Sequence, residues 1–349
     1  MALIPKRKTF ISAVVSMAVI DMGAQAAIFP DATPRATSLI EFDHVAIENT
    51  SAEYHSFAET SKTVEKDGFS TTVYGPLNFN ESISKEKIDA DARKFGQTEY
   101  GEGTVNPEVQ AALAGVAKLQ KRAMVATKKA MYEAMTLHKI TGGYKGSEGF
   151  EDIVFAVPVA NKKILTNSGS EVYWNDTTNA SPLDNLYAAY KAMKNKPSMA
   201  IMSSDTYGDF YSNGQILTAD DNTSGRKKNY TENENVDPEA KFFRAGRLRY
   251  KEMAIDIYVE SDTYKVGATD TLYMPDEYVV LTSRASGSTE YAGIPVAETG
   301  AEGVRNIAAK VDVREVVTID PPQHKVVHRT APLPLIKDGN SFFSLKVKA

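Results

Sequence analysis

One uninterrupted helical pattern constrains this chain more than any other feature. The pattern opens at Asn106, a good N-cap residue, with Pro107 at the first helical position and Glu108 in the first turn. Apolar residues then recur near helical spacing: Val109, Leu113, Val116, Met124, Met131 and Met135. The pattern predicts a helix over 106–140, about 50 Å long at a rise of about 1.5 Å per residue. Such a rod is unusually long for a compact domain.

The same segment predicts which side chains of the helix face the core, which face solvent, and where the helix ends. Its methionines are interpreted as packing residues. Four lysines occupy other faces and are assigned away from the core: Lys118, Lys121, Lys128 and Lys129. Gly142-Gly143 supplies the expected stop, because glycine accepts the left-handed conformation that often terminates a helix.

Length and composition bound the class of protein. The chain has 349 residues, of which 42% are hydrophobic, so it can bury a substantial core. It exceeds the size at which single cores stop growing, and we expect subdivision. The formal net charge of −5 disfavours a protein that neutralises many phosphates of a nucleic acid. The absence of cysteine excludes disulfides, thiolate nucleophiles and Cys-ligated zinc.

The sequence carries no recognisable catalytic motif. There is no Walker-type loop, no GxSxG elbow and no HExxH. His324 and His328 are four residues apart in a strand-like segment, where they would lie about 13 Å apart, too far to share one metal ion. We assign no catalytic, cofactor-binding or metal-binding residue, and no cofactor.

The segment from Thr218 to Glu239 is polar, charged and almost free of large aliphatic residues. It is interpreted as an exposed loop that is poorly ordered relative to the long helix. Four acidic residues in it could in principle bind Ca²⁺, but their spacing is not that of an EF-hand: Asp220, Asp221, Glu232 and Glu234. We therefore favour a solvated surface over a site.

A polar two-stranded hairpin is predicted over residues 51–84. A β-favouring run at 38–48 precedes it as an anchoring strand, and Asp67-Gly68 is a good turn signal. A ribbon without a hydrophobic face is marginal by itself, so we expect this one to lie on a neighbouring subunit. The tip residues are the candidate inter-subunit contact: Glu65, Lys66, Asp67, Gly68 and Phe69.

The rest of the chain reads as mixed α and β structure. A short helix is expected over 85–95, and strands over 150–166 and 170–174. A second helix is expected from Ser181, as N-cap, with Pro182 at its first position. The buried-strand candidate at 197–204 follows at once, which suggests a small α/β unit. The chain then ends in strands.

The N-terminus allows two interpretations. Lys6-Arg7-Lys8, the apolar run 10–20 and Ala24-Gln25-Ala26 imitate the three parts of a secretory signal. The run is too short to span a bilayer, which needs about 20 apolar residues. A cleaved signal would favour an exported bacterial surface or ligand-binding protein, whereas a retained arm would pack on its own or a neighbouring subunit.

The C-terminal motif resembles a known family. HRTAPLPLIKDGNSFF, residues 328–343, is similar to the closing pattern SAPLPLLxDPNSF of the lambda-type bacteriophage major capsid protein E family. Residues 64–88 resemble the extended-loop motif of that family around Gly68 and Tyr74, although most of its prolines after Pro76 are missing.

Further agreements follow in the family's order. The segment 92–143 resembles the short helix, Gly-rich link and long helix of the family. The segment 174–183 resembles its W-x-D…PL element, and 274–281 resembles its P-D-x-x-V-V-L strand. Asp320-Pro321-Pro322 also fits the family pattern. The insertion at 218–241 departs from the pattern, and the first 37 residues are not matched.

The resemblance implies an α+β chain with the Hong Kong 97-like phage capsid fold. Its expected parts are an N-terminal arm and anchoring strand (1–50), an extended E-loop hairpin (51–84), a peripheral P-domain (85–175) with the spine helix 106–140, an axial A-domain (176–310) and a return to P-domain strands (311–349).

The implied function is structural rather than enzymatic. Identical subunits would form the hexamers and pentamers of an icosahedral head, assembled in the host bacterial cytoplasm around DNA that is bound without sequence specificity. Scaffold, portal and decoration proteins are implied partners, and a membrane is not. Because export would separate such a subunit from its partners, the family reading favours the retained N-terminal arm.

Overall fold

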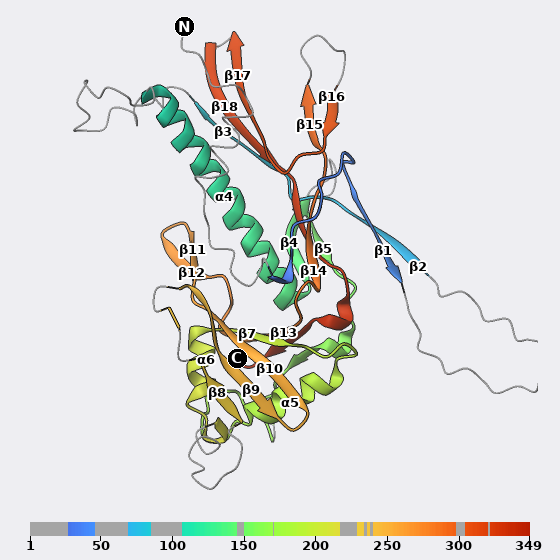
Figure 1. The fold of residues 1–349 in the computed structure, drawn as a ribbon, viewed down its shortest axis with the longest axis vertical. Helices are drawn as coiled ribbons and strands as arrows, with labels where there is room; N and C mark the ends of the chain where they lie inside the picture. Colours follow the sequence, from blue (N-terminus) through green and yellow to red (C-terminus); the bar gives the residue numbers. More distant parts are fainter. Residues whose placement is uncertain are drawn as a thin grey trace, which may run out of the picture.

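The computed structural model describes residues 27–45, 69–84, 107–144, 150–169, 171–216, 229–233, 236–237, 240–297, 304–319 and 322–349. A seven-stranded sheet forms the lower half of the molecule in Figure 1. Its strand order is β6-β20-β13-β7-β10-β9-β8. The bounds are β6 Lys162–Ile164, β7 Met199–Ser203, β8 Tyr230–Glu232, β9 Phe242–Tyr250, β10 Met253–Glu260, β13 Tyr278–Thr282 and β20 Phe343–Lys346. The β7–β10 and β20–β6 pairs are parallel and the others antiparallel.

Two helices pack on this sheet, α5 (Pro182–Ala192) and α6 (Ser204–Tyr211). The structure confirms the start of α5, with Ser181 at the N-cap and Pro182 at the first position. The two helices and the sheet share one core, which includes Leu186, Phe210 and Trp174. Residues 171–174, expected as a strand, form none, although the Trp174 side chain is fully buried.

The long helix α4 spans Pro107–Leu137, which confirms its start and most of its length. The predicted stop at Gly142-Gly143 is wrong, because the helix ends earlier, at His138, which has a left-handed φ of 56°. Histidine is among the few non-glycine residues enriched in this conformation. The two glycines instead lie in β4 (Lys139–Tyr144), where the pairing with β5 (Phe150–Val154) shifts register and Gly142 has a φ of 73°.

A three-stranded sheet, in the order β17-β18-β3, lies beside α4 in Figure 1. Its strands are β17 Asp312–Ile319, β18 Pro322–Thr330 and β3 Phe79–Ser84. Val116 of α4 packs against Val313 of β17 in a small separate apolar cluster. The C-terminal half of α4 enters the main core through Met131 and Met135.

The described part of the predicted ribbon is built from β1 (Ile40–Val45) and β2 (Phe69–Tyr74), which pair antiparallel. The described part of the run expected at 38–48 is therefore one arm of the ribbon rather than a separate anchor. Residues 79–84, assigned to the hairpin from sequence, pair with β18 instead. Pro76 separates β2 from β3 and, without an N–H, cannot continue a ladder.

Three more strand pairs complete the described structure. They are β11 (Thr263–Val266) with β12 (Thr269–Leu272), β14 (Gly287–Tyr291) with β19 (Pro332–Ile336), and β15 (Ile294–Ala297) with β16 (Val304–Ile307). Short 3-10 turns cover Val159–Asn161 and Gly339–Ser341. The strand β20 joins the seven-stranded sheet, so the C-terminal segment does not return only to the strands beside α4.

Residues 27–37 lie along β14 of the same chain. Asp31 forms a parallel bridge with Thr289, and Ile28 and Phe29 are fully buried. Gly287 allows this approach, because a Cβ there would collide with the ring of Phe29 and the backbone oxygen of Leu335. The end of the N-terminal segment is thus packed on its own subunit, while the apolar run 10–20 lies outside the described residues.

Candidate assembly surfaces and the helix–sheet junction

The β1–β2 ribbon extends away from the body in Figure 1. Within the described residues, its two strands form a separate two-stranded sheet, and neither strand joins another sheet. Leu39, directly before β1, and Val73 of β2 are about half exposed, at 50% and 52%. A projecting ribbon that carries exposed apolar side chains is a surface to which another chain can bind.

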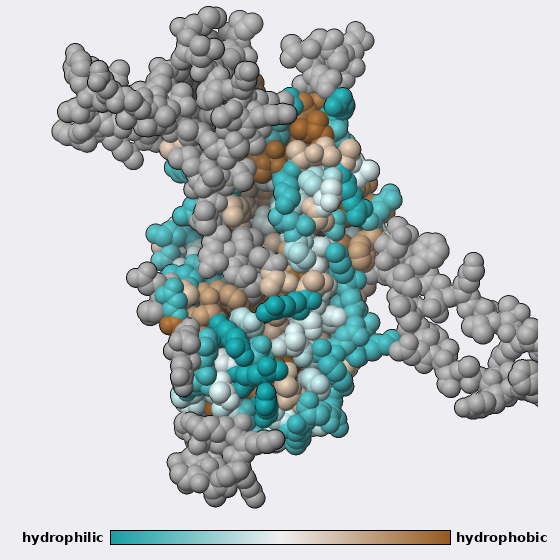
Figure 2. All heavy atoms as spheres, viewed as in Figure 1, coloured by the Kyte–Doolittle hydropathy of each residue, from teal (hydrophilic) through white to brown (hydrophobic). Residues whose placement is uncertain are grey.

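Other exposed apolar residues lie on connections and hairpins away from the core. Val304 of β16 is 70% exposed, and Figure 2 shows apolar atoms gathered at this upper end of the molecule. Three further exposed residues are Val154 at the end of β5, Val159 in the connection that follows, at 90%, and Ile164 at the end of β6. Hydrophilic residues cover much of the lower half of the same view.

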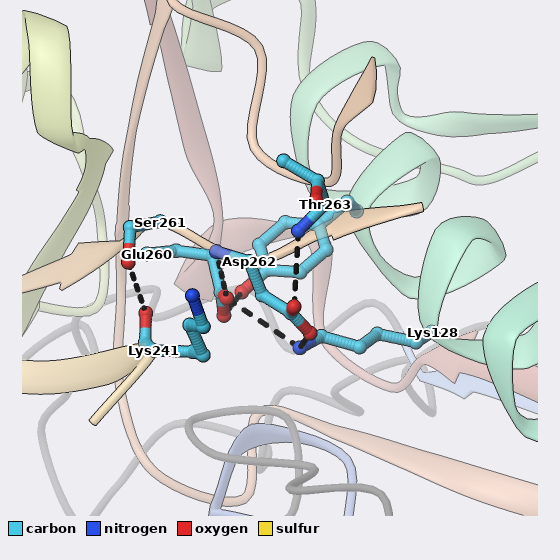
Figure 3. Close-up of polar contacts among 7 residues, drawn as sticks. Lys128, Lys241, Glu260, Ser261, Asp262 and Thr263 are labelled. Atoms are coloured by element: carbon cyan, nitrogen blue, oxygen red, sulfur yellow. Dashed lines mark hydrogen bonds and ion pairs between the residues drawn. The ribbon is translucent and has the colours of Figure 1, made fainter. Parts of the chain in front are cut away.

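A buried polar cluster joins α4 to the end of β10 (Figure 3). Lys128 of α4 donates to Asp262 Oδ2 at 2.7 Å and to Glu260 Oε1 at 3.4 Å. Tyr132, one turn further along α4, donates its hydroxyl to Glu260 Oε2 at 2.6 Å. The side chains of Lys128 and Glu260 are 1% and 0% exposed, so this ion pair is removed from water. We call these four residues the helix–sheet junction.

The assignment of Lys128 to an outward face is therefore wrong. Its position between Met124 and Met131 places it on the apolar stripe of α4, with steps of four and three residues. That spacing is the signal that could have identified it from sequence. Its charge had suggested an exposed position like those of Lys118 and Lys121, which are exposed.

Burial sets the electrostatics of the junction. Loss of water raises the pKa of the Glu260 carboxyl above its usual value, and the Lys128 charge and the Tyr132 hydrogen bond oppose the shift. The Lys128 ammonium also lies 4.5 Å from the ring centroid of Tyr273. The cluster is thus a buried ion pair beside the rings of Tyr132 and Tyr273, with a carboxyl group whose pKa is raised by burial.

Two buried histidines lie at other junctions. Burial and the nearby Lys162 charge lower the pKa of His138, at the end of α4, from 6.5 to about 4. Burial also lowers the pKa of His328 in β18, opposed by Glu81 and Asp312. The side chain of His324 lies outside the described residues, so its predicted separation from His328 stays a prediction.

The residues assigned to the hairpin tip are mostly outside the described ranges. Only Phe69 falls within them, as the first residue of β2. Of the acidic residues considered for Ca²⁺, Glu232 is exposed at the end of β8, and the other three lie outside. In the part of the chain that the structure describes, no group of three or more potential metal ligands occurs. No described helix is long and apolar enough to cross a membrane.

Comparison with known proteins gives a family and a fold. The family model "Phage major capsid protein E" matches residues 9–347, which include the signal-like apolar run. The chain is similar in structure to a protein assigned as the capsid protein of a prophage of E. coli CFT073. The TM-score is 0.66 at 13% identity, over 99% of this chain and 100% of that one. A phage-related protein from Bordetella bronchiseptica RB50 gives a TM-score of 0.49 at 9% identity, over 97% and 96%. No curated protein matches the sequence.

Proposed function

This chain belongs to the phage major capsid protein E family and has the Hong Kong 97-like capsid fold, and from that premise we propose how its subunits associate. It is the major capsid protein of a tailed-phage-like particle, structural rather than enzymatic, and its place is the phage head. The rival reading as an exported surface or ligand-binding protein is not supported. Self-association is therefore its basic property, and the open question is which surfaces carry it.

We infer that the subunits form hexamers and pentamers through the β1–β2 ribbon. The observation that carries this is a two-stranded ribbon that extends from the body and has exposed apolar side chains at Leu39 and Val73. In the family's terms the ribbon is the E-loop, α4 with β3, β17 and β18 is the P-domain, and the seven-stranded sheet is the A-domain. A neighbouring subunit supplies the surface that covers the ribbon.

The other proposed partners follow from the family alone. Scaffold, portal and decoration proteins would bind the assembled shell, and packaged DNA would lie inside without sequence-specific contact, consistent with the net charge of −5. The apolar run 10–20 would be retained and packed on the shell. The mass of the mature chain, starting at Met1 or Ala2 rather than near Ala27, tests its retention.

The ribbon is tested by changes that spare the fold. Val73→Asp places a charge on the exposed face of β2, where burial against a neighbour would cost several kcal/mol. We expect the subunit to fold with an unchanged circular dichroism spectrum and to lose shell formation, measured by negative-stain microscopy. Deletion of Glu65–Phe69 should have the same effect.

The matched control is Val266→Asp on the β11–β12 hairpin, at a residue of similar exposure, 58%. This variant should still assemble. Normal shells from Val73→Asp and from the deletion would show that the ribbon is not the surface that joins subunits.

A further inference from the structure

The helix–sheet junction holds a buried amine directly against a carboxyl group. Lys128 Nζ is 2.7 Å from Asp262 Oδ2, and the lysine comes from α4 whereas the aspartate follows β10. The backbone N–H of Thr263 donates to Asp262 Oδ1 at 3.0 Å, which fixes the orientation of the carboxyl group (Figure 3). A buried amine from α4 and a carboxyl group that directly follows β10 and is 26% exposed are therefore held within hydrogen-bond distance of each other.

A third group stands beside this pair. Glu260 Oε1 is 3.4 Å from Lys128 Nζ and accepts the backbone N–H of Asp262 at 3.1 Å, so the carboxyl of Glu260 is anchored to both partners. Its second oxygen accepts the Tyr132 hydroxyl at 2.6 Å. A fully buried carboxyl with these contacts can receive a proton from the amine and return it to a leaving oxygen.

We propose that Lys128 and Asp262 condense into an intramolecular isopeptide bond, with Glu260 as the proton shuttle. The ion pair first passes its proton from the ammonium to the carboxylate, giving a neutral amine and a carboxylic acid. Lys128 Nζ then attacks Asp262 Cγ and forms the C–N bond. Glu260 takes the amine proton and gives one to a hydroxyl of the tetrahedral carbon, the C–O bond breaks, and one water leaves. No oxidant or external cofactor enters the balance.

Little water surrounds the amine and the proposed shuttle residue, because the side chains of Lys128 and Glu260 are 1% and 0% exposed. Burial raises the pKa of the Glu260 carboxyl above its usual value, which is the direction that favours proton uptake from the amine. The product would tie α4 covalently to the end of β10 within one subunit, and it does not depend on the proposed subunit contacts.

Intact mass spectrometry of the denatured full-length protein tests the bond. We expect a mass about 18 Da below that of the sequence, corresponding to one lost water. Tryptic digestion should yield a branched peptide that joins residues 123–129 to 252–265, because an acylated Lys128 resists cleavage. Folded protein at its full sequence mass would overturn the proposal. So would a deficit mapped elsewhere, such as a succinimide at Asp67-Gly68.

Two variants separate the chemistry from simple packing. Glu260→Gln retains the shape of the shuttle residue but cannot carry the proton, so its mass should equal that of its sequence. Lys128→Arg should also show no deficit. Lys129→Arg, at the partly exposed neighbour in α4, is the matched control and should keep the full loss of water. A Glu260→Gln protein that still contains the branched peptide would refute the role given to Glu260.

Discussion

At the scale of single residues, His138 has both an unusual backbone conformation and a buried titratable side chain. It ends α4 in a left-handed conformation and buries its imidazole, whose Nε2 has no hydrogen-bond partner in the described structure. In the unfolded chain the His138 imidazole takes up a proton near its usual pKa of 6.5, whereas in the folded chain it does so only near the lowered pKa of about 4. The unfolded state therefore binds more protons between these values, and the free energy of unfolding decreases as pH falls through this window.

We predict that His138 contributes about 3 kcal/mol to this acid destabilisation, at about 1.4 kcal/mol per pKa unit. His138→Asn should remove it, because asparagine tolerates the left-handed conformation and does not titrate. Urea unfolding, followed by the fluorescence of the buried Trp174, measures the difference between wild type and variant. The wild-type advantage should shrink from pH 7 to pH 4. A constant difference would contradict the assignment.

The prediction that Lys128 is exposed was wrong because it followed from the charge of the side chain and not from its position on the helix. Lys128 and Lys118 are the same residue type on the same helix, yet one is buried and the other exposed. The apolar stripe predicts this difference, but the partners of Lys128 are 132 and 134 residues away in the chain. A local sequence pattern cannot predict that carboxyl groups at the end of β10 lie beside this lysine.

At the scale of elements, α4 owes its stability to packing along one face. Met135 is fully buried in the main core, so Met135→Ala should lower the free energy of unfolding by about 2–5 kcal/mol through lost apolar burial and a cavity. Lys118→Ala, on the exposed face, should change it by less than about 0.5 kcal/mol. Denaturant unfolding of both variants provides the comparison. Equal effects would mean that the helix is not held by that face.

Elements with strong local signals could be predicted, and pairings between distant segments could not. The starts of α4 and α5 follow from Pro107 and from Ser181-Pro182, whose local preferences agree with the fold. The pairing of β3 with β18 joins residues about 245 positions apart, for example Glu81 with His328. Alternation predicts a strand but not its partner, so β3 was assigned to the hairpin.

At the scale of the whole molecule, the order of the motifs predicts the family and the fold. It does not fix the residues at which the domains begin and end. The C-terminal motif at 328–343 spans β18 and β19 and reaches the start of β20, and so crosses from the strands beside α4 into the seven-stranded sheet. A boundary drawn at residue 311 therefore places one sheet's strands in two domains. The proposed hairpin tip and the acidic loop stay predictions, because they lie mainly outside the described residues.

The function of this chain rests on its ability to build a closed shell from copies of itself. Electron cryo-microscopy of the purified full-length protein, with light scattering on the same sample, tests it most directly. We predict closed icosahedral particles built of hexamers and pentamers, in which the β1–β2 ribbon of each subunit lies on a neighbour. A protein that remains a monomer of 38.1 kDa at every concentration and salt condition tested would contradict the account.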